Sequence, residues 1–187
     1  PPVAAPVEVL EEVLAGLRDG RAEVVWDALP AAYQRDVIEV IQLAGQRLDP
    51  KLHAGALGVL SRIKVLLKEK KGFLLAALKR DESAPVAELE AVWDSLPAMI
   101  EAVATGELTN PKWLENPDGA KFFKNTASKL LMEANKFSGA LGEKEDHWER
   151  LKSAKGELVE NVAGKATVKL ISGENEILVS LREVEGK

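Results

Sequence analysis

The side chains best suited to acid–base chemistry are concentrated in one short stretch, Glu143–Arg150, where carboxylates surround His147. On a helix, Glu143 lies one turn before His147, so the two side chains could form an acid–histidine pair. The alternative is a solvated polar face on which Trp148 is the single buried anchor. The other histidine, His53, lies at the start of an expected helix and is interpreted as structural or surface-exposed. No catalytic residue is therefore assigned.

Several other chemistries are excluded by composition. The 187 residues include no cysteine and two histidines, which excludes disulfides, thiolate metal sites and cysteine nucleophiles. We find no Gly-x-Ser-x-Gly elbow, phosphate-binding glycine loop, dinucleotide fingerprint or His-Glu-x-x-His helix. The longest apolar run, residues 73–78, is far shorter than the ~18–20 residues that cross a bilayer. The sequence thus predicts no metal, no cofactor and no transmembrane segment.

Basic side chains are concentrated in residues 51–80, which hold eight basic residues and one acidic residue, for a net charge of +7. The flanking segments are acidic. Residues 1–50 hold four basic and nine acidic residues, and residues 81–110 hold no basic and seven acidic residues. The basic side chains could pair with these acidic segments inside the fold, bind an anionic membrane surface, or bind an acidic protein partner. Nucleic acid is disfavoured because the whole chain is acidic, at −5, and the cluster contains no interleaved aromatic residues. The residues assigned to such a surface are Arg62, Lys64, Lys68, Lys70 and Lys71.

An imperfect internal repeat gives a second set of candidate binding residues. Residues 25–31, VWDALPA, recur as VWDSLPA at residues 92–98. One interpretation is a repeated helix–kink–helix corner, in which the tryptophan anchors one helix and the proline begins the next. The other is a pair of equivalent sites in which the tryptophan and aspartate face a ligand. In that case the ligand-facing residues are Trp26, Asp27, Trp93 and Asp94.

Hydrophobic periodicity indicates the elements that must position these residues. Apolar residues at three- and four-residue spacing predict a succession of helices between Val7 and about Ala154. The expected helices span about 7–18, 22–29, 31–47, 50–71, 73–78, 86–95, 97–106, 119–138 and 143–154. Gly72 is expected to cap the fourth helix, and the glycines at 139 and 142 are expected to break the eighth.

The C-terminal residues alternate between apolar and polar side chains, which indicates strands. Residues 166–171 and 176–184 flank the turn sequence SGEN and predict a β-hairpin. The expected fold is mainly α, a multi-helix domain with a small C-terminal antiparallel hairpin or three-stranded meander. Its organisation would be a Pro/Ala spacer at residues 1–6, a helical domain at 7–154 and a hairpin segment at 155–187 packed on it.

The two ends of the chain carry a resemblance. The Pro/Ala tract, the stretch LRDGRAEVVWDALP at residues 17–30 and the ending that runs from ATVKL at 166–170 to VEGK at 184–187 are similar to small exported bacterial proteins of planctomycete type. The ends also resemble the nuclear-transport-factor-2-like α+β superfamily, which implies an N-terminal helix packed across a curved antiparallel sheet. Residues 31–154 depart from that pattern, because helices are expected where the superfamily has strands.

The Pro/Ala spacer at residues 1–6 predicts an exported or periplasmic location, as in a lipoprotein anchored through a removed N-terminal segment, with a cytoplasmic location as the alternative. A turn at residues 185–186 further predicts that the native chain continues beyond Lys187. The leading hypothesis for function is a noncatalytic exported protein that acts by binding or assembly. The alternatives are a small-molecule carrier with an apolar pocket between the helices and the hairpin, and an enzyme that uses acid–histidine chemistry.

Overall fold

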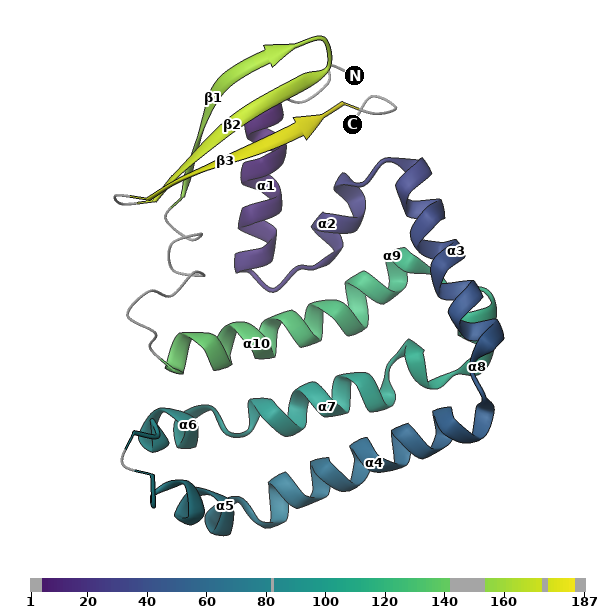
Figure 1. The fold of residues 1–187 in the computed structure, drawn as a ribbon, viewed down its shortest axis with the longest axis vertical. Coiled ribbons are helices and arrows are strands. Elements are labelled where there is room, and N and C mark those ends of the chain that lie inside the picture. Colours follow the sequence, from purple (N-terminus) through teal and green to yellow (C-terminus); the bar gives the residue numbers. More distant parts are fainter. Residues whose placement is uncertain (1–4, 82, 142–153, 173–174, 184–187) are drawn as a thin grey trace.

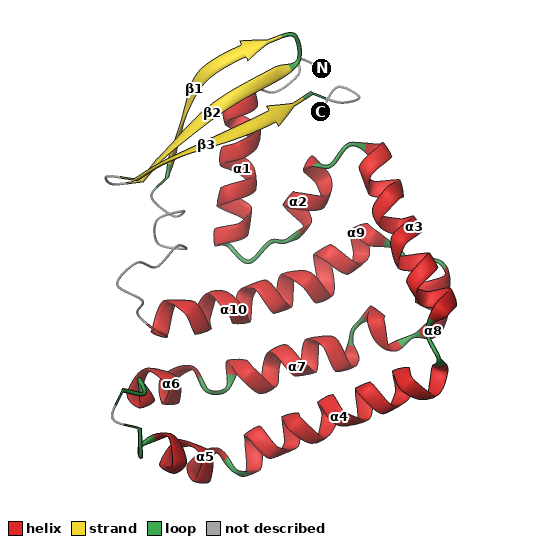
Figure 2. Cartoon of the chain, viewed as in Figure 1, coloured by secondary structure: helices red, strands yellow, loops and turns green. Residues whose placement is uncertain are grey.

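The chain folds into helices followed by one antiparallel sheet (Figure 1, Figure 2). The computed structural model describes residues 5–81, 83–141, 154–172 and 175–183. Helices occupy the chain from Pro6 to Leu141, and the mainly α class with a C-terminal sheet is therefore confirmed. The helical elements are α1 (Pro6–Arg18), α2 (Glu23–Ala28), α3 (Ala31–Arg47), α4 (Pro50–Glu69), α5 (Lys71–Leu78), α6 (Val86–Val92), α7 (Ser95–Thr105), η1 (Glu107–Thr109), α8 (Pro111–Glu115), α9 (Gly119–Phe122), η2 (Phe123–Ala127) and α10 (Ser128–Leu141).

Helices α10, α7 and α4 form a stack, in which α10 is nearest the sheet and α4 is farthest from it (Figure 1). Helix α7 packs against α4 on one side and against α10 on the other, and α3 crosses near one end of the stack to contact α8 (Figure 1). The side chains of Ser95, Pro97 and Ala102 on α7 are buried. Because these side chains are small, the two neighbouring helices can approach α7 closely. Helix α4 is thus covered by α7 on one face.

The sheet contains strands β1 (Lys155–Val162), β2 (Lys165–Ser172) and β3 (Asn175–Arg182) in the order β1-β2-β3. The sequence allows either a two-stranded hairpin or a three-stranded meander, and the structure contains the meander. Strand β2 is central and alternates in burial: Ala166, Val168 and Leu170 are buried. Helix α1 packs against β1 and β2, so this apolar face of the sheet is covered by the N-terminal helix (Figure 2).

Two expected helix boundaries are wrong. Helix α4 ends at Glu69 and α5 begins at Lys71, so Gly72 lies in the first turn of α5 rather than at a cap. The indole of Trp93 donates a hydrogen bond of 2.9 Å to the carbonyl of Leu67, which satisfies a terminal carbonyl without a glycine. Helix α10 continues through Gly139 to Leu141. A glycine inside a helix lowers its stability by about 1 kcal/mol relative to alanine, and α10 tolerates this loss.

The expected polar helix at 143–154 falls almost entirely on residues 142–153, which lie outside the described residues. Helix α7 begins at Ser95, two residues before the expected start at Pro97, so Pro97 lies in the first helical turn. A proline is accepted there because its missing N–H would have had no partner within the helix.

We predict that Gly119→Ala destabilises the protein by about 1–3 kcal/mol, because a Cβ at this position would overlap the indole ring of Trp26. Gly58→Ala is the matched control. No atom lies within 4 Å of a Cβ at Gly58, so alanine should stabilise α4 by about 0.5–1 kcal/mol. Urea unfolding of both variants measures the difference. Equal unfolding free energies would contradict the tight contact between α9 and α2.

Candidate functional site

The five basic residues assigned to a binding surface do not act as one patch. Lys64 donates to Glu101 on α7 at 2.5 Å, and this hydrogen bond lowers the pKa of Glu101 below its usual value, with a further contribution from the charge of Lys68. Lys71 lies 3.8 Å from Asp94. Lys64 and Lys71 therefore pair with acidic side chains of the protein itself.

The other three members, Arg62, Lys68 and Lys70, are exposed and form no ion pair with any residue that the structure describes. Arg62 and Lys70 line a shallow groove of about 370 Å³ on α4 together with Ser61, Val65, Leu66 and Glu69. Lys68 lies about 200° around the helix from Leu66 and therefore on another flank. The outward part of the predicted basic surface consequently centres on Arg62 and Lys70.

Large apolar side chains are exposed beside these two cations. The exposed fractions are 72% for Leu52, 54% for Val59, 40% for Ile63 and 49% for Leu66. Their spacing of seven, four and three residues places them along one stripe of α4. We call Leu52, Val59, Ile63 and Leu66 with the neighbouring Lys51, Arg62 and Lys70 the apolar–basic surface. No residue of α4 is fully buried, although the whole helix is described.

The tryptophans of the internal repeat fill packing positions. Trp26 is 7% exposed and lies 5.3 Å from Phe123 between ring centroids. Trp93 is 4% exposed and bonds to the end of α4. Both aspartates of the repeat are exposed, and the two tryptophans contact different elements. The repeat therefore forms two corners, each with its own neighbours.

The histidines give no acid–base pair among the described residues. The Nε2 atom of His53 lies 2.9 Å from the carbonyl oxygen of Leu108, so this histidine connects α4 to η1. His147 and Glu143 lie outside the described residues. Within the described ranges, no group of three or more His, Asp or Glu side chains could hold a metal ion.

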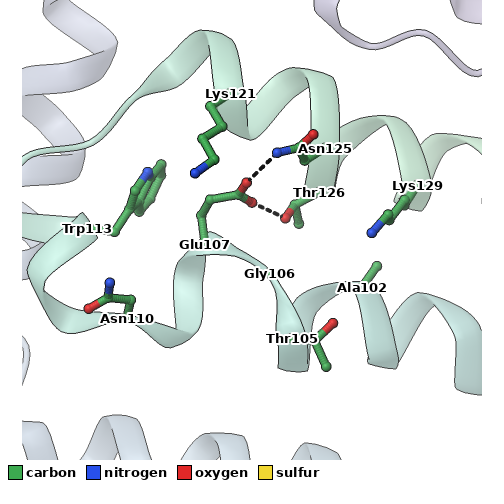
Figure 3. Close-up of a pocket in the computed structure, with 10 residues that line it drawn as sticks. All are labelled: Ala102, Thr105, Gly106, Glu107, Asn110, Trp113, Lys121, Asn125, Thr126 and Lys129. Atoms are coloured by element: carbon green, nitrogen blue, oxygen red, sulfur yellow. Dashed lines mark hydrogen bonds between the residues drawn. The ribbon is translucent and has the colours of Figure 1, made fainter.

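A polar cleft lies where α7 passes through η1 into α8 and faces η2 and α10 (Figure 3). Its volume is about 540 Å³. The Glu107 carboxylate lies inside it and accepts hydrogen bonds from the Nδ2 of Asn125, at 2.9 Å, and from the hydroxyl of Thr126. The lining residues are Ala102, Thr105, Gly106, Glu107, Asn110, Trp113, Lys121, Asn125, Thr126 and Lys129.

Local backbone geometry makes the two bonds to Glu107 possible. Asn125 and Thr126 belong to η2, a single turn of π-helix, which is rare and is found frequently at functional sites. Gly106 lets η1 approach this turn, because a Cβ there would overlap the Thr126 hydroxyl. Glu107 and Thr126, which are nineteen positions apart in the sequence, thereby come into contact.

The carboxyl group of Glu107 is held in its ionised form. Burial alone would raise its pKa, but the hydrogen bonds from Thr126 and Asn125, the backbone N–H and the positive charge of Lys121 outweigh it and lower the pKa below 4.5. The cleft thus contains a negative charge at neutral pH, with Lys121 and Lys129 flanking it (Figure 3).

Sequence reasoning did not assign this cleft. The available signal was the group of turn-forming residues at 108–119 around Trp113, which marks an irregular connection. Nothing in the sequence pairs Glu107 with Asn125 and Thr126, because the latter two lie within an expected regular helix. The cleft is also polar and is lined by helical elements, unlike the expected apolar pocket beside the hairpin.

Comparison with known proteins found no matching family model, no matching curated protein and no matching solved structure. Among the described residues, none of the helices combines the length and apolar character needed to cross a membrane. The site is therefore argued from its own geometry.

We predict that Thr126→Val destabilises the protein by about 1.5–3 kcal/mol, because a buried hydroxyl bonded to an ionised carboxylate is lost at nearly constant volume. Thr105→Val is the control, since the exposed Thr105 hydroxyl donates to the Glu101 carbonyl in its own helix and bonds to no other described residue. Its effect should stay within about 0.5 kcal/mol. Equal losses in thermal unfolding would contradict the role of the Thr126–Glu107 bond.

The lowered pKa of Glu107 gives a pH dependence of stability. A carboxyl with a folded-state pKa below its unfolded value stabilises the fold fully above pH 4.5, and this stabilisation is lost as the pH falls through the folded pKa. Glu107→Gln should therefore flatten the acid side of the stability profile. Urea unfolding between neutral and acidic pH measures it, and identical slopes in both proteins would contradict the assignment.

Proposed function

We propose that this chain is a noncatalytic exported protein that acts by binding, and that its apolar–basic surface docks on an anionic lipid surface. The observation that carries the proposal is the exposed stripe of Leu52, Val59, Ile63 and Leu66 beside cations that form no ion pair with a described residue. Export remains a prediction of the sequence alone.

The proposed interaction combines two energies. Apolar side chains gain free energy on leaving water, about 25 cal/mol per Å² of buried apolar surface. Basic residues beside an anionic membrane each add about 1 kcal/mol at short range. A helix with both features side by side lies in the membrane interface with its apolar face inserted. Helix α4 offers this combination over its 20 residues.

A lipid surface fits the shape of α4 better than an acidic protein does. The exposed side chains project from one convex helix, and the groove beside Arg62 is shallow. A fluid interface adapts to a convex helix, whereas a protein partner would need a complementary groove and would bury a defined patch. An acidic protein partner is therefore an outcome of the test rather than the proposal.

The electrostatic part is tested by replacing Lys51, Arg62 and Lys70 together with glutamine. Loss of three charges near the surface should weaken partitioning by about 3 kcal/mol, which is about a hundredfold. Co-sedimentation with phosphatidylcholine vesicles, with and without phosphatidylglycerol, measures the effect. Binding of the unmodified protein should require phosphatidylglycerol and should weaken as salt rises.

The matched control replaces Lys112, Lys124 and Lys165 with glutamine, which removes the same charge from exposed positions elsewhere. This variant should bind vesicles nearly as well as the unmodified protein. Equal weakening in both triple variants would indicate a general charge effect and would contradict the apolar–basic surface. No sedimentation of the unmodified protein with anionic vesicles would exclude the lipid proposal and favour an acidic protein partner.

A further inference from the structure

The polar cleft contains hydrogen-bonding groups that the fold itself leaves available, and none of its lining residues belongs to the apolar–basic surface on α4. The volume of about 540 Å³ lies within the ~300–1,000 Å³ typical of small-molecule sites. The cleft has a fixed anion at Glu107 and two cations, Lys121 and Lys129, that form no ion pair with a described residue. Its formal charge is therefore +1.

Glu107 has acceptor capacity beyond its bonds within the protein. An ionised carboxylate offers about four lone-pair positions, and Asn125, Thr126 and the backbone N–H of Glu107 use about three of them. A ligand that approaches Glu107 must therefore donate hydrogen bonds, through a hydroxyl or an ammonium group. A ligand bearing only negative charge would be repelled at this point.

Elsewhere in the cleft, a ligand must instead accept hydrogen bonds. Lys121 and Lys129 flank the carboxylate and can only donate hydrogen bonds (Figure 3). The Nε1 atom of Trp113 is buried and finds no acceptor in the part of the chain that the structure describes. Other atoms of the Trp113 ring line the cleft, so the environment of this indole changes when a ligand binds beside it.

We propose that the cleft binds a small carboxylate that also carries a hydroxyl or amino group. The ligand carboxylate lies between Lys121 and Lys129, its hydroxyl or ammonium donates to Glu107, and the ligand packs beside the ring of Trp113. The charge of such an anion matches the surplus positive charge of the cleft. A neutral sugar leaves both lysines without a counter-charge, and a simple dicarboxylate leaves Glu107 without a donor.

The full chain is titrated with four probes while the indole N–H signals are followed by ¹H–¹⁵N NMR. Glucuronate carries a carboxylate and hydroxyls, L-glutamate carries carboxylates and an ammonium, succinate lacks the donor, and glucose lacks the carboxylate. Trp113→Phe assigns the signal of Trp113 among the four tryptophans. Glucuronate or L-glutamate should move that signal with saturation, and which of them does so identifies the donor group.

Lys129→Gln should weaken binding of the active probe at least about tenfold, because the variant loses the charged donor to the ligand carboxylate, and Lys129 forms no ion pair with a described residue. Lys112→Gln, an exposed lysine outside the cleft, should leave the affinity unchanged. Equal weakening in both variants, saturable binding of succinate or glucose as tight as that of the other two, or no movement of the Trp113 signal with any probe would each overturn the proposal.

Discussion

The attachment of α7 at both of its ends is the constraint on which the rest of the helical arrangement depends. Just before its start, Trp93 bonds to the carbonyl of Leu67 at the end of α4. Just after its end, Glu107 accepts from Asn125 and Thr126 in the π-turn that leads into α10. Between these points α7 is flanked by α4 and α10 (Figure 1). Two polar attachments therefore fix which faces of the neighbouring helices remain outside.

The same constraint divides the basic charge of α4. Because α7 covers one face, Lys64 is turned toward Glu101, and Lys71 reaches Asp94 beyond the end of the helix. Arg62 and Lys70 project elsewhere and share a groove with Leu66. The segregation of charge along the chain thus has two consequences in space. Part of it holds acidic and basic segments together, and the remainder, Arg62 and Lys70, forms no ion pair with a described residue although Glu69 lines the same groove.

Local periodicity was sufficient to predict most of the fold. The spacing of apolar residues predicted α1 to α4 nearly to their ends, and alternation with the turn at 172–175 predicted β2 and β3. The boundary at Gly72 was mistaken because a side chain from far along the sequence satisfies the helix end, which no local pattern reveals. The cleft was missed for the same reason: Glu107 and Thr126 are joined across nineteen positions and through a π-turn that resembles regular helix in sequence.

Each proposed site contains a charged side chain that is bonded within the fold and, near it, a charged side chain that forms no ion pair with a described residue. In the cleft, Glu107 has a structural role, since its bonds hold η1 against η2, and the same bonds keep it ionised where a ligand would meet it. Stability alone explains the presence of Glu107. It does not explain Lys129, which faces the cleft without an ion pair to any described residue. Arg62 has the corresponding position on α4, beside Lys64, which the fold does use.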